Sequence, residues 1–595
     1  MDQKRLIAAI AISIGILLTF EVWNKSNAPV PAPAVTAQAP GAGPAPAVPA
    51  PRTSAGPAAA PAGTEASAAA QAAPAQVVTV SNGRVEGRLS ARGLILEQLT
   101  LTDYRETIEP NSPLVTLLAP RGTPEGYFAQ WGWTAADNRT RVPDNDTDWT
   151  VTGGPLSATT PVTLSWDNGQ GQVFEAVVSL DGDYMFHVDQ RVRNNAAEPI
   201  TVLPWGRIRR ERTPQLAGFY ILHEGFIAVQ DGRLTEITYS DGKTAQTGER
   251  RAQGSAWDNE AVQGWAGLSD KYWLTALTRA DDGTALRSAF RHIGDGAIDR
   301  WQVDVAPPAA VTVAAGATSS LATRLFAGAK EVRLLDRYRD GLHIQDFDKA
   351  IDFGWFYFIT KPFFYAIDWL FKFTGNFGIA ILIFTFALKV AFFPLANKAY
   401  KSMSRMRILG PKMTEIRERY KEDPQKMQAE MMALYKTEKV NPASGCLPIL
   451  IQIPVFFALY KVLFVTIEMR HAPFFGWIRD LSAPDPTNLF NLFGLLPFDP
   501  PSFFHLPAWA LIMGVTMWMQ QRLNPQPPDP IQAKVFAWMP VIFTFMLASF
   551  PAGLVIYWSW NNILSVAQQW WIMRLDAKGN PKPPAQGGLA AAAKK

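Results

Sequence analysis

Cysteine is almost absent from this chain of 595 residues, since Cys446 is the only one. A single thiol excludes an intrachain disulfide and any metal cluster built on several cysteines. Histidines are also few and scattered, with no HExxH or other paired spacing: His187, His223, His292, His343, His471 and His505. Because a zinc site needs several ligands brought together, we expect no metal and no other cofactor.

Charge is scarce as well. Charged residues make up 18% of the chain against 48% hydrophobic residues, and the net charge of +4 is too small for a nucleic-acid-binding surface, so no DNA binding is expected. The only GKT sequence, Gly242 to Thr244, lacks the upstream glycine of a phosphate-binding loop because Ile237 stands there. Acidic residues fall mostly at expected turns, with no recognisable catalytic set. We therefore predict that the protein is not an enzyme.

What the chain does have is apolar sequence in two places, Leu6 to Phe20 and after residue 350, which indicates a membrane protein with a large soluble insert. The N-terminal MDQKR and the apolar run after it fit either a cleaved secretory signal, with a site near Ala28, or an anchor. We favour an uncleaved transmembrane anchor over residues 1–26, because the run with Val22 and Trp23 approaches spanning length. Residues 27–76 consist almost entirely of Ala, Pro, Gly and small polar residues, a composition that predicts a disordered tether.

Residues 77–325 change to short alternating stretches broken by Gly, Asn and Asp. Examples are RLSARGLILEQLTL, QVFEAVVSLDGDYMFHVDQRVRN and GWAGLSDKYWLTAL. Apolar placement with a period of two, together with β-branched and aromatic residues, predicts strands. The expected product is one large antiparallel β-sandwich.

The last third predicts a helical membrane domain. Residues 350–375 place Trp and Phe among Lys361, Asp368 and Lys372, which favours an amphipathic helix lying in the membrane interface. A five-span core is expected over 376–575, followed by a tail at 576–595. The expected spans are Gly378 to Leu395, Leu447 to Val465, Leu506 to Met519, Val535 to Phe550 and Ala552 to Met573, the last two forming a tight hairpin at Pro551.

Loop cations predict the orientation. The segment 396–446 carries eleven Lys and Arg residues, whereas the 467–505 loop has only Arg470 and Arg479. Cytoplasmic loops carry the excess of Lys and Arg. Six spans in all would place both termini in the cytoplasm and the sandwich outside, in the periplasm if the chain comes from a bacterium with two membranes.

The first core span contains one cation, Lys389, inside GIAILIFTFALKVAFFPL. A charge at that depth costs roughly 2.5–3.5 kcal/mol on insertion scales and usually faces a bundle interior or a water-filled cavity. On a straight helix Lys389 would lie about 13 Å below Lys398. Two interpretations stay open: the lysine bends past Pro394 to the headgroups, or it faces a polar cavity within the membrane.

Other polar residues repeat on the spans at helical spacing. Thr385 and Lys389 are four apart, and Tyr557, Asn561 and Ser565 repeat that spacing, while Gln452 lies in another span. Each alone is more typical of hydrogen bonding between helices. As a set around a buried cation they indicate a wet, amphiphilic groove.

The basic segment 396–446 predicts a cytoplasmic helical hairpin, whose second arm begins at the Asp423 and Pro424 signal. Two apolar stripes would pack its arms together: Met413, Ile416 and Tyr420 on one, and Met427, Met431 and Leu434 on the other. The hairpin is either a solvated charged surface or a docking surface for a ribosome, targeting factor or nascent chain.

Three long stretches closely resemble the YidC membrane protein insertases: FPLANKAYKSMSRMRILGPKM, MMALYKTEKVNPASGCLPILIQIPVFFALY and PVIFTFMLASFPAGLVIYWSWNNILSVAQQ. The likeness is strong over about 350–575, and the anchor, tether and sandwich match the Gram-negative layout. By resemblance, Thr385 and the pair Tyr557 and Trp558 line a substrate path, and Lys389 takes the position of a groove cation that is commonly arginine in the family.

The resemblance implies an insertase and chaperone of the bacterial inner membrane that inserts nascent membrane proteins at the boundary with the lipid bilayer. It acts alone or beside the SecYEG translocon, with the ribosome or targeting factors as further partners. Two other classes stay open: a secondary transporter, although no paired repeat is evident, and a membrane-anchored glycan enzyme, although no paired-carboxylate site can be located.

Overall fold

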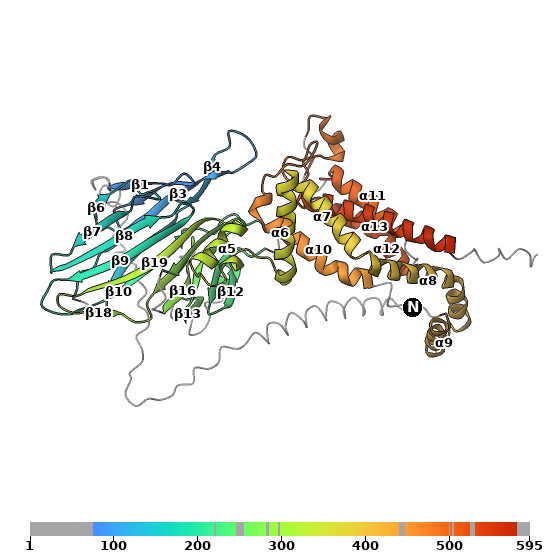
Figure 1. The fold of residues 1–595 in the computed structure, drawn as a ribbon, viewed down its shortest axis with the longest axis horizontal. Coiled ribbons are helices and arrows are strands. Elements are labelled where there is room, and N and C mark those ends of the chain that lie inside the picture. The colour runs from blue at the N-terminus through green and yellow to red at the C-terminus, as the bar shows by residue number, and fades with distance from the viewer. Residues whose placement is uncertain are drawn as a thin grey trace, which may run out of the picture. The chain divides into compact units, whose positions relative to one another are not determined.

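The computed structural model describes residues 75–579, apart from 138, 219–221, 245–254, 281–284, 295–297, 439–446, 499, 502–504 and 524–529. The expected anchor, nearly all of the tether, most of the tail and Cys446 lie outside the described residues. The described chain contains a β-sandwich followed by a helical module (Figure 1).

Two antiparallel sheets form the sandwich. The first has ten described strands, in the order β1-β2-β3-β5-β10-β17-β16-β13 with β4 beside β3 and β18 beside β10. Their bounds are β1 (Val77–Ser81), β2 (Val85–Ser90), β3 (Ile95–Arg105), β4 (Leu114–Leu118), β5 (Tyr127–Ala135), β10 (Ile200–Arg210), β13 (Trp257–Ala261), β16 (Leu286–Gly294), β17 (Asp299–Ala306) and β18 (Val311–Val313).

The second sheet has nine described strands, in the order β12-β11-β14-β15-β19-β9-β8-β7-β6. Their bounds are β6 (Thr150–Gly153), β7 (Val162–Asp167), β8 (Gln172–Leu180), β9 (Met185–Asn194), β11 (Gly225–Gln230), β12 (Arg233–Thr238), β14 (Gly264–Ser269), β15 (Trp273–Arg279) and β19 (Thr318–Ala329). The paired strands of both sheets run antiparallel.

Aromatic side chains join the two sheets. Phe226 of β11 stacks on Phe290 of β16 with ring centroids 4.7 Å apart, and Trp133 of β5 meets Phe174 of β8 at 5.3 Å. Along β8 buried and half-buried residues alternate strictly, which is the pattern of a strand with one face on a core. The expected antiparallel sandwich is therefore present, and the stretch 172–194 forms a hairpin of two strands, β8 and β9.

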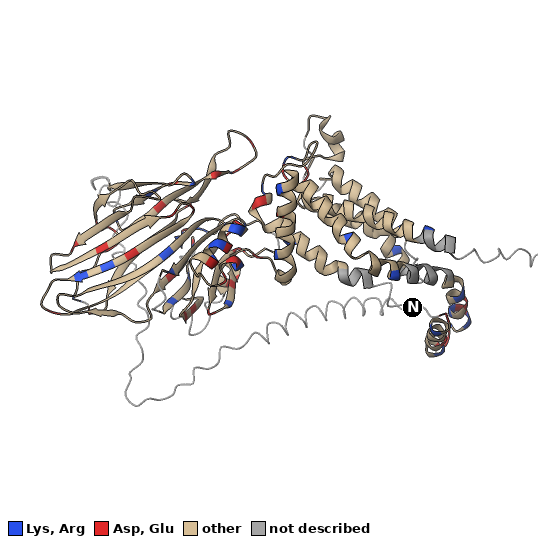
Figure 2. Cartoon of the chain, in the orientation of Figure 1, with Lys and Arg blue, Asp and Glu red and all other residues tan. Residues whose placement is uncertain are grey.

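The remaining regular elements of the described chain are helices. Their bounds are α3 (Tyr239–Thr244), α5 (Val332–Gly341), η1 (Phe347–Ala350), α6 (Tyr357–Thr374), α7 (Phe377–Ala391), α8 (Phe393–Arg419), α9 (Pro424–Thr437), α10 (Leu447–Val465), η3 (Ile467–Met469), η4 (Leu489–Gly494), α11 (Ala508–Leu523), α12 (Pro530–Met546) and α13 (Ala552–Gly579). Figure 2 shows that α10 to α13 carry few charges, whereas α9 and the end of α8 carry many.

No single described helix is both long and apolar enough to meet the usual criteria for crossing a bilayer. The pair Phe377–Ala391 and Phe393–Tyr400 meets them together, bent by 62° at its break, and Gln452–Val465 and Ala533–Met546 are shorter apolar helices. The expected span from Gly378 to Leu395 lies within this pair but is not one straight helix, because α7 ends at Ala391. Pro394, in the first turn of α8, has no N–H with which to continue the hydrogen-bond ladder.

An ionic joint connects α5, η1 and α6. The Lys361 ammonium lies 2.6 Å from Asp336 and also contacts Asp348, while Tyr357 and Tyr365 donate their hydroxyls to these carboxylates. Burial opposes the charge on Lys361, yet the two carboxylates hold its pKa above the usual value, so the ammonium stays charged. Paired charges of this kind fix α5 on α6.

Aromatic contacts connect α6 to α7. Phe371 of α6 stacks on Phe377 with ring centroids 3.7 Å apart, and Phe363 meets Phe384 at 4.9 Å. Gly378 lies under the ring of Phe474, where an added Cβ would approach to 2.0 Å. These contacts set the position of α7, the helix that carries Lys389.

Candidate functional site

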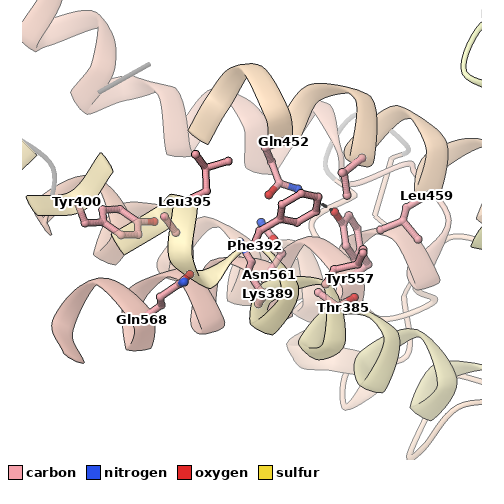
Figure 3. Close-up of a pocket in the computed structure, with 13 residues that line it drawn as sticks. Thr385, Lys389, Phe392, Leu395, Tyr400, Gln452, Leu459, Tyr557, Asn561 and Gln568 are labelled. Carbon is pink, nitrogen blue, oxygen red and sulfur yellow. Dashed lines mark hydrogen bonds between the residues drawn. The ribbon is translucent and has the colours of Figure 1, made fainter. Parts of the chain in front are cut away.

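A cavity lies where α7, the start of α8, α10 and α13 meet (Figure 3). Its volume of about 70 Å³ compares with the roughly 10–15 Å³ that one water requires, so it has room for several waters. The lining residues are Thr385, Leu388, Lys389, Phe392, Leu395, Ala396, Tyr400, Gln452, Val455, Leu459, Tyr557, Asn561 and Gln568.

Lys389 reaches the cavity from the last turn of α7. Its Nζ donates a hydrogen bond of 2.9 Å to the Ser565 hydroxyl of α13, and the side chain is half-buried. Trp560 of α13 donates to the Leu382 carbonyl of α7 at 3.1 Å, which fixes the two helices side by side. Because the chain bends by 62° directly after this turn, the 13 Å estimate for a straight helix does not apply.

The other polar groups differ in how they are satisfied. Thr385 donates to the Ile381 carbonyl of its own helix at 2.7 Å, and Gln452 donates to the Tyr557 hydroxyl at 3.3 Å. In contrast, Asn561 Oδ1 and Gln568 Nε2 are buried and have no hydrogen-bond partner in the described part of the chain. Buried polar atoms normally find a partner, so this wall of the cavity can receive water or a polar guest.

Five of the groove residues expected from sequence line the cavity: Thr385, Lys389, Gln452, Tyr557 and Asn561. Ser565 does not line it but accepts the hydrogen bond from Lys389, which does. Trp558 does not line it. Its ring packs against Phe456 at 4.8 Å and Phe543 at 5.7 Å. Adjacent residues of an α-helix point about 100° apart, so Tyr557 and Trp558 cannot share one face.

Sequence reasoning missed Gln568 and Tyr400. Gln568 follows Asn561 by seven residues, which is two helical turns and hence the same face, so its spacing was a readable signal. Tyr400 lies beyond the bend at Phe392, and helical periodicity counted from Lys389 is lost there.

Apolar surfaces flank the cavity on two of its helices. On α7 the exposed side chains are Ile383, Phe386 and Val390, and on α10 they are Ile453 and Phe457. Phe386 and Val390 are four residues apart, and Val390 directly follows Lys389 in sequence. This part of the helical module therefore combines a cavity with polar groups in its wall and exposed apolar side chains on two of the helices that line it.

The hairpin residues lie on α8 and α9 and in the turn between them. Asp423 caps α9 by accepting from the Lys426 N–H at 3.1 Å, with Pro424 in the first turn. All six stripe residues are half-buried: Met413, Ile416, Tyr420, Met427, Met431 and Leu434. The arms meet where Tyr435 contacts Met413 at 3.8 Å and Lys412 pairs with Glu438 at 2.8 Å. No residue of α9 is fully buried, so this contact is shallow.

The described residues contain no group of three or more His, Cys, Asp or Glu side chains placed to hold a metal ion. The fold and the cavity thus define a protein of two modules, a β-sandwich joined to an apolar helical bundle with a polar interior.

Comparison with known proteins identifies this class. Residues 77–366 match the model of the YidC periplasmic domain, and residues 369–579 match that of the 60Kd inner membrane protein. A membrane protein insertase YidC of Granulibacter bethesdensis is 53% identical over 96% of this chain and 98% of its own length. One from Methylorubrum extorquens is 51% identical over 84% of this chain and 81% of its own. The chain belongs to the YidC family of membrane protein insertases.

A crystal structure described as an active YidC insertase with its first transmembrane domain resolved covers 84% of this chain and 94% of that chain, at 20% identity and a TM-score of 0.33. The family implies an inner-membrane protein with a periplasmic domain.

Proposed function

We propose that this protein inserts newly made inner-membrane proteins and helps them fold, by receiving the polar flank of a client in the cavity around Lys389. The observation that carries the proposal is the Lys389–Ser565 pair, inside a cavity whose wall holds the unpartnered amide atoms of Asn561 and Gln568. A cation there attracts acidic residues of an incoming tail, and the amides offer hydrogen bonds to its backbone.

The apolar part of the client would lie outside the cavity. The exposed faces of α7 and α10, with Phe386 and Val390 on one and Ile453 and Phe457 on the other, border the cavity and suit a hydrophobic segment at the boundary of protein and lipid. Burial of that segment supplies about 25 cal/mol per Å². The membrane potential acts on its flanking charges. Insertion of this kind needs no covalent chemistry, so the proposed activity is not enzymatic.

The topology belongs to the proposal. Six spans, counting the anchor at 1–26, would place both termini and the hairpin in the cytoplasm, and the sandwich in the periplasm. The concentration of Lys and Arg in 396–446 supports this orientation. The charged hairpin would then face the ribosome or a targeting factor, and the spans would be free to work alone or beside the Sec translocon.

Site-specific photocrosslinking to a stalled nascent membrane protein tests the proposal. A photoreactive residue at Asn561 or Gln568 should crosslink to the polar flank of the client. The same residue at Val515, which is exposed on α11 and does not line the cavity, serves as the control. Equal crosslinking from all three positions, or none from the cavity positions, would contradict the proposed path.

A further inference from the structure

An apolar lobe precedes α11. Residues 489–498, here called the apolar lobe, contain no Lys, Arg, Asp or Glu. Six of their large hydrophobic side chains are exposed, and Leu495 is 82% exposed. The others are Phe490, Leu492, Phe493, Leu496 and Phe498. A contiguous exposed apolar patch normally marks an interaction surface.

Several backbone groups of the lobe have hydrogen-bond partners in the lobe itself or in the adjoining Asn488. Asn491 Oδ1 accepts from the Gly494 N–H at 2.9 Å, and its carbonyl accepts from Leu496 at 3.0 Å. The carbonyl of the buried Asn488 accepts from Phe493 at 2.7 Å, and its Oδ1 from Phe490 at 3.2 Å. Irregular backbone survives near hydrocarbon only when its polar groups have such partners.

The turn itself is unusual for one that faces water. Leu492 and Phe493 adopt φ values of 51° and 59°, in the left-handed region where glycine or asparagine is usual. Large apolar residues at both positions keep the tip of the lobe hydrophobic.

The lobe is held firmly on the bundle. The Leu489 N–H donates to the Leu506 carbonyl at 2.9 Å, so the lobe adjoins the start of α11. Asp485, which is buried, accepts from the Trp509 N–H at 3.0 Å and from the Thr487 hydroxyl at 2.8 Å. In Figure 1 this orange segment projects beyond the labelled end of α11. The surface therefore presents a fixed apolar tip.

From these observations we propose that the apolar lobe inserts into the headgroup boundary of the outer leaflet. Its apolar surface continues that of α11, where Ile512, Val515 and Trp518 are also exposed. The cavity borders the middle of α10, at Gln452 to Leu459, whereas the lobe lies in the segment that follows the C-terminal end of this helix and does not line the cavity. Lipid is therefore a more suitable occupant of the lobe than a client bound in the cavity. The leaflet assignment rests on the proposed topology. The expected depth is that of interfacial elements, about 5–10 Å.

The single native cysteine makes a direct test possible. A Cys446→Ser chain that also carries Leu495→Cys is labelled with an environment-sensitive fluorophore and reconstituted, full length, in vesicles of phosphatidylethanolamine and phosphatidylglycerol. Lipids with a nitroxide near the headgroup should remove about half of the fluorescence, and those with a nitroxide near the chain end much less, because the tip lies at the interface. Iodide supplied on both sides of the bilayer should quench weakly. The matched control is Val262→Cys in the same background, 54% exposed and following β13 of the sandwich, where iodide should quench strongly.

Iodide quenching at position 495 equal to that at 262 would overturn the inference, since the lobe would then face water. Protection from both iodide and nitroxide would overturn it as well, because protein, such as a second copy of the chain, would then cover the lobe. The readout does not depend on client insertion. Labelled protein that inserts no client but shows interfacial quenching would count against the proposed function and not against the lobe.

Discussion

At the scale of single residues, Lys389 is the group on which the proposed function depends most. Its hydrogen bond to Ser565 holds the ammonium against α13. If the charge attracts acidic tails, Lys389→Arg should keep activity because guanidinium also stays positive. Lys389→Ala should lower insertion of a client with Asp or Glu in its tail by about tenfold, equivalent to about 1.4 kcal/mol of lost attraction.

Insertion into vesicles of two clients that differ only in tail charge measures this effect. The client with a neutral tail is the internal control, since it should be affected little. Equal loss for both clients in the alanine variant would show that Lys389 is not an electrostatic receptor.

A second residue-scale prediction concerns Glu468 in η3, which ties the end of α10 to the start of α5. Its Oε1 accepts from the Val332 N–H at 2.9 Å, and its Oε2 is buried without a partner in the described chain. Burial raises the pKa of Glu468 from 4.5 to about 7, and the neighbouring carboxylates of Glu331 and Asp368 add to the rise. A carboxyl with a raised pKa contributes stability below pH 4.5 that is lost as pH rises through about 7.

Glu468→Gln keeps the acceptor without the charge. Its melting temperature should match the parent near pH 5 and exceed it near pH 8, where the ionised glutamate costs on the order of 3 kcal/mol. Thermal melts of both proteins in one detergent across this range measure the difference. A difference in melting temperature between the two proteins that stays constant with pH would mean that Glu468 does not titrate in this range.

Helical spacing in the sequence is enough to place several polar residues on the cavity wall, whereas their roles stay predictions. Asn561 and Ser565 were predicted because they repeat the spacing of four residues from Tyr557 on α13, and Gln568, seven residues after Asn561, lies on the same side of the helix and lines the cavity. Trp558 was expected by resemblance to line the substrate path together with Tyr557; its ring packs against Phe456 and Phe543, outside the cavity, and its role in the path stays a prediction. Residues three, four or seven apart lie on the same face of a helix, whereas two adjacent residues point in directions about 100° apart.

At the scale of elements, the sequence predicted the bounds of α10 at Leu447 and Val465 correctly, but α12 lies at Pro530–Met546 rather than Val535 to Phe550. The cause is that the turn 547–551 is itself apolar, with Leu547, Ala548 and Phe550, so hydropathy could not separate turn from helix. In the fold, α11 packs against both α12 and α13. The bend after Ala391 was missed for the same reason, since Phe392 to Leu395 continue the apolar run.

The hairpin of α8 and α9 gives an element-scale prediction. Met427→Asp with Met431→Asp puts two charges into the half-buried stripe, each at a cost of about 1–3 kcal/mol, and should separate the arms. Client insertion should then fall while the bundle stays folded. Met432→Asp is the matched control, because this methionine lies beside Met431 and is 48% exposed.

Hydrogen exchange at α9 reports opening, and vesicle insertion reports activity. Normal insertion by the double variant with an opened hairpin would rule out a docking role and leave the hairpin as a solvated charged surface.

At the scale of the whole molecule, removal of the sandwich separates an insertase from an enzyme of the periplasmic domain. The structure sets the boundary: β19 runs from Thr318 to Ala329, so a cut at 320 would divide it, whereas deletion of 77–330 removes the strand whole. Asp336, Asp348 and Lys361 remain, so the ionic joint that holds α5 on α6 and positions α7 is kept. We expect the shortened chain to insert a simple single-span client at a rate within several-fold of that of the full chain, since the cavity and its apolar borders lie on α7, α8, α10 and α13.

Adding Lys389→Ala to the deletion should again impair insertion of clients with acidic tails, which tests whether the remaining activity uses the same cavity. Complete loss of insertion by a shortened chain whose helices still melt cooperatively would place an essential site in the sandwich and contradict the proposed function.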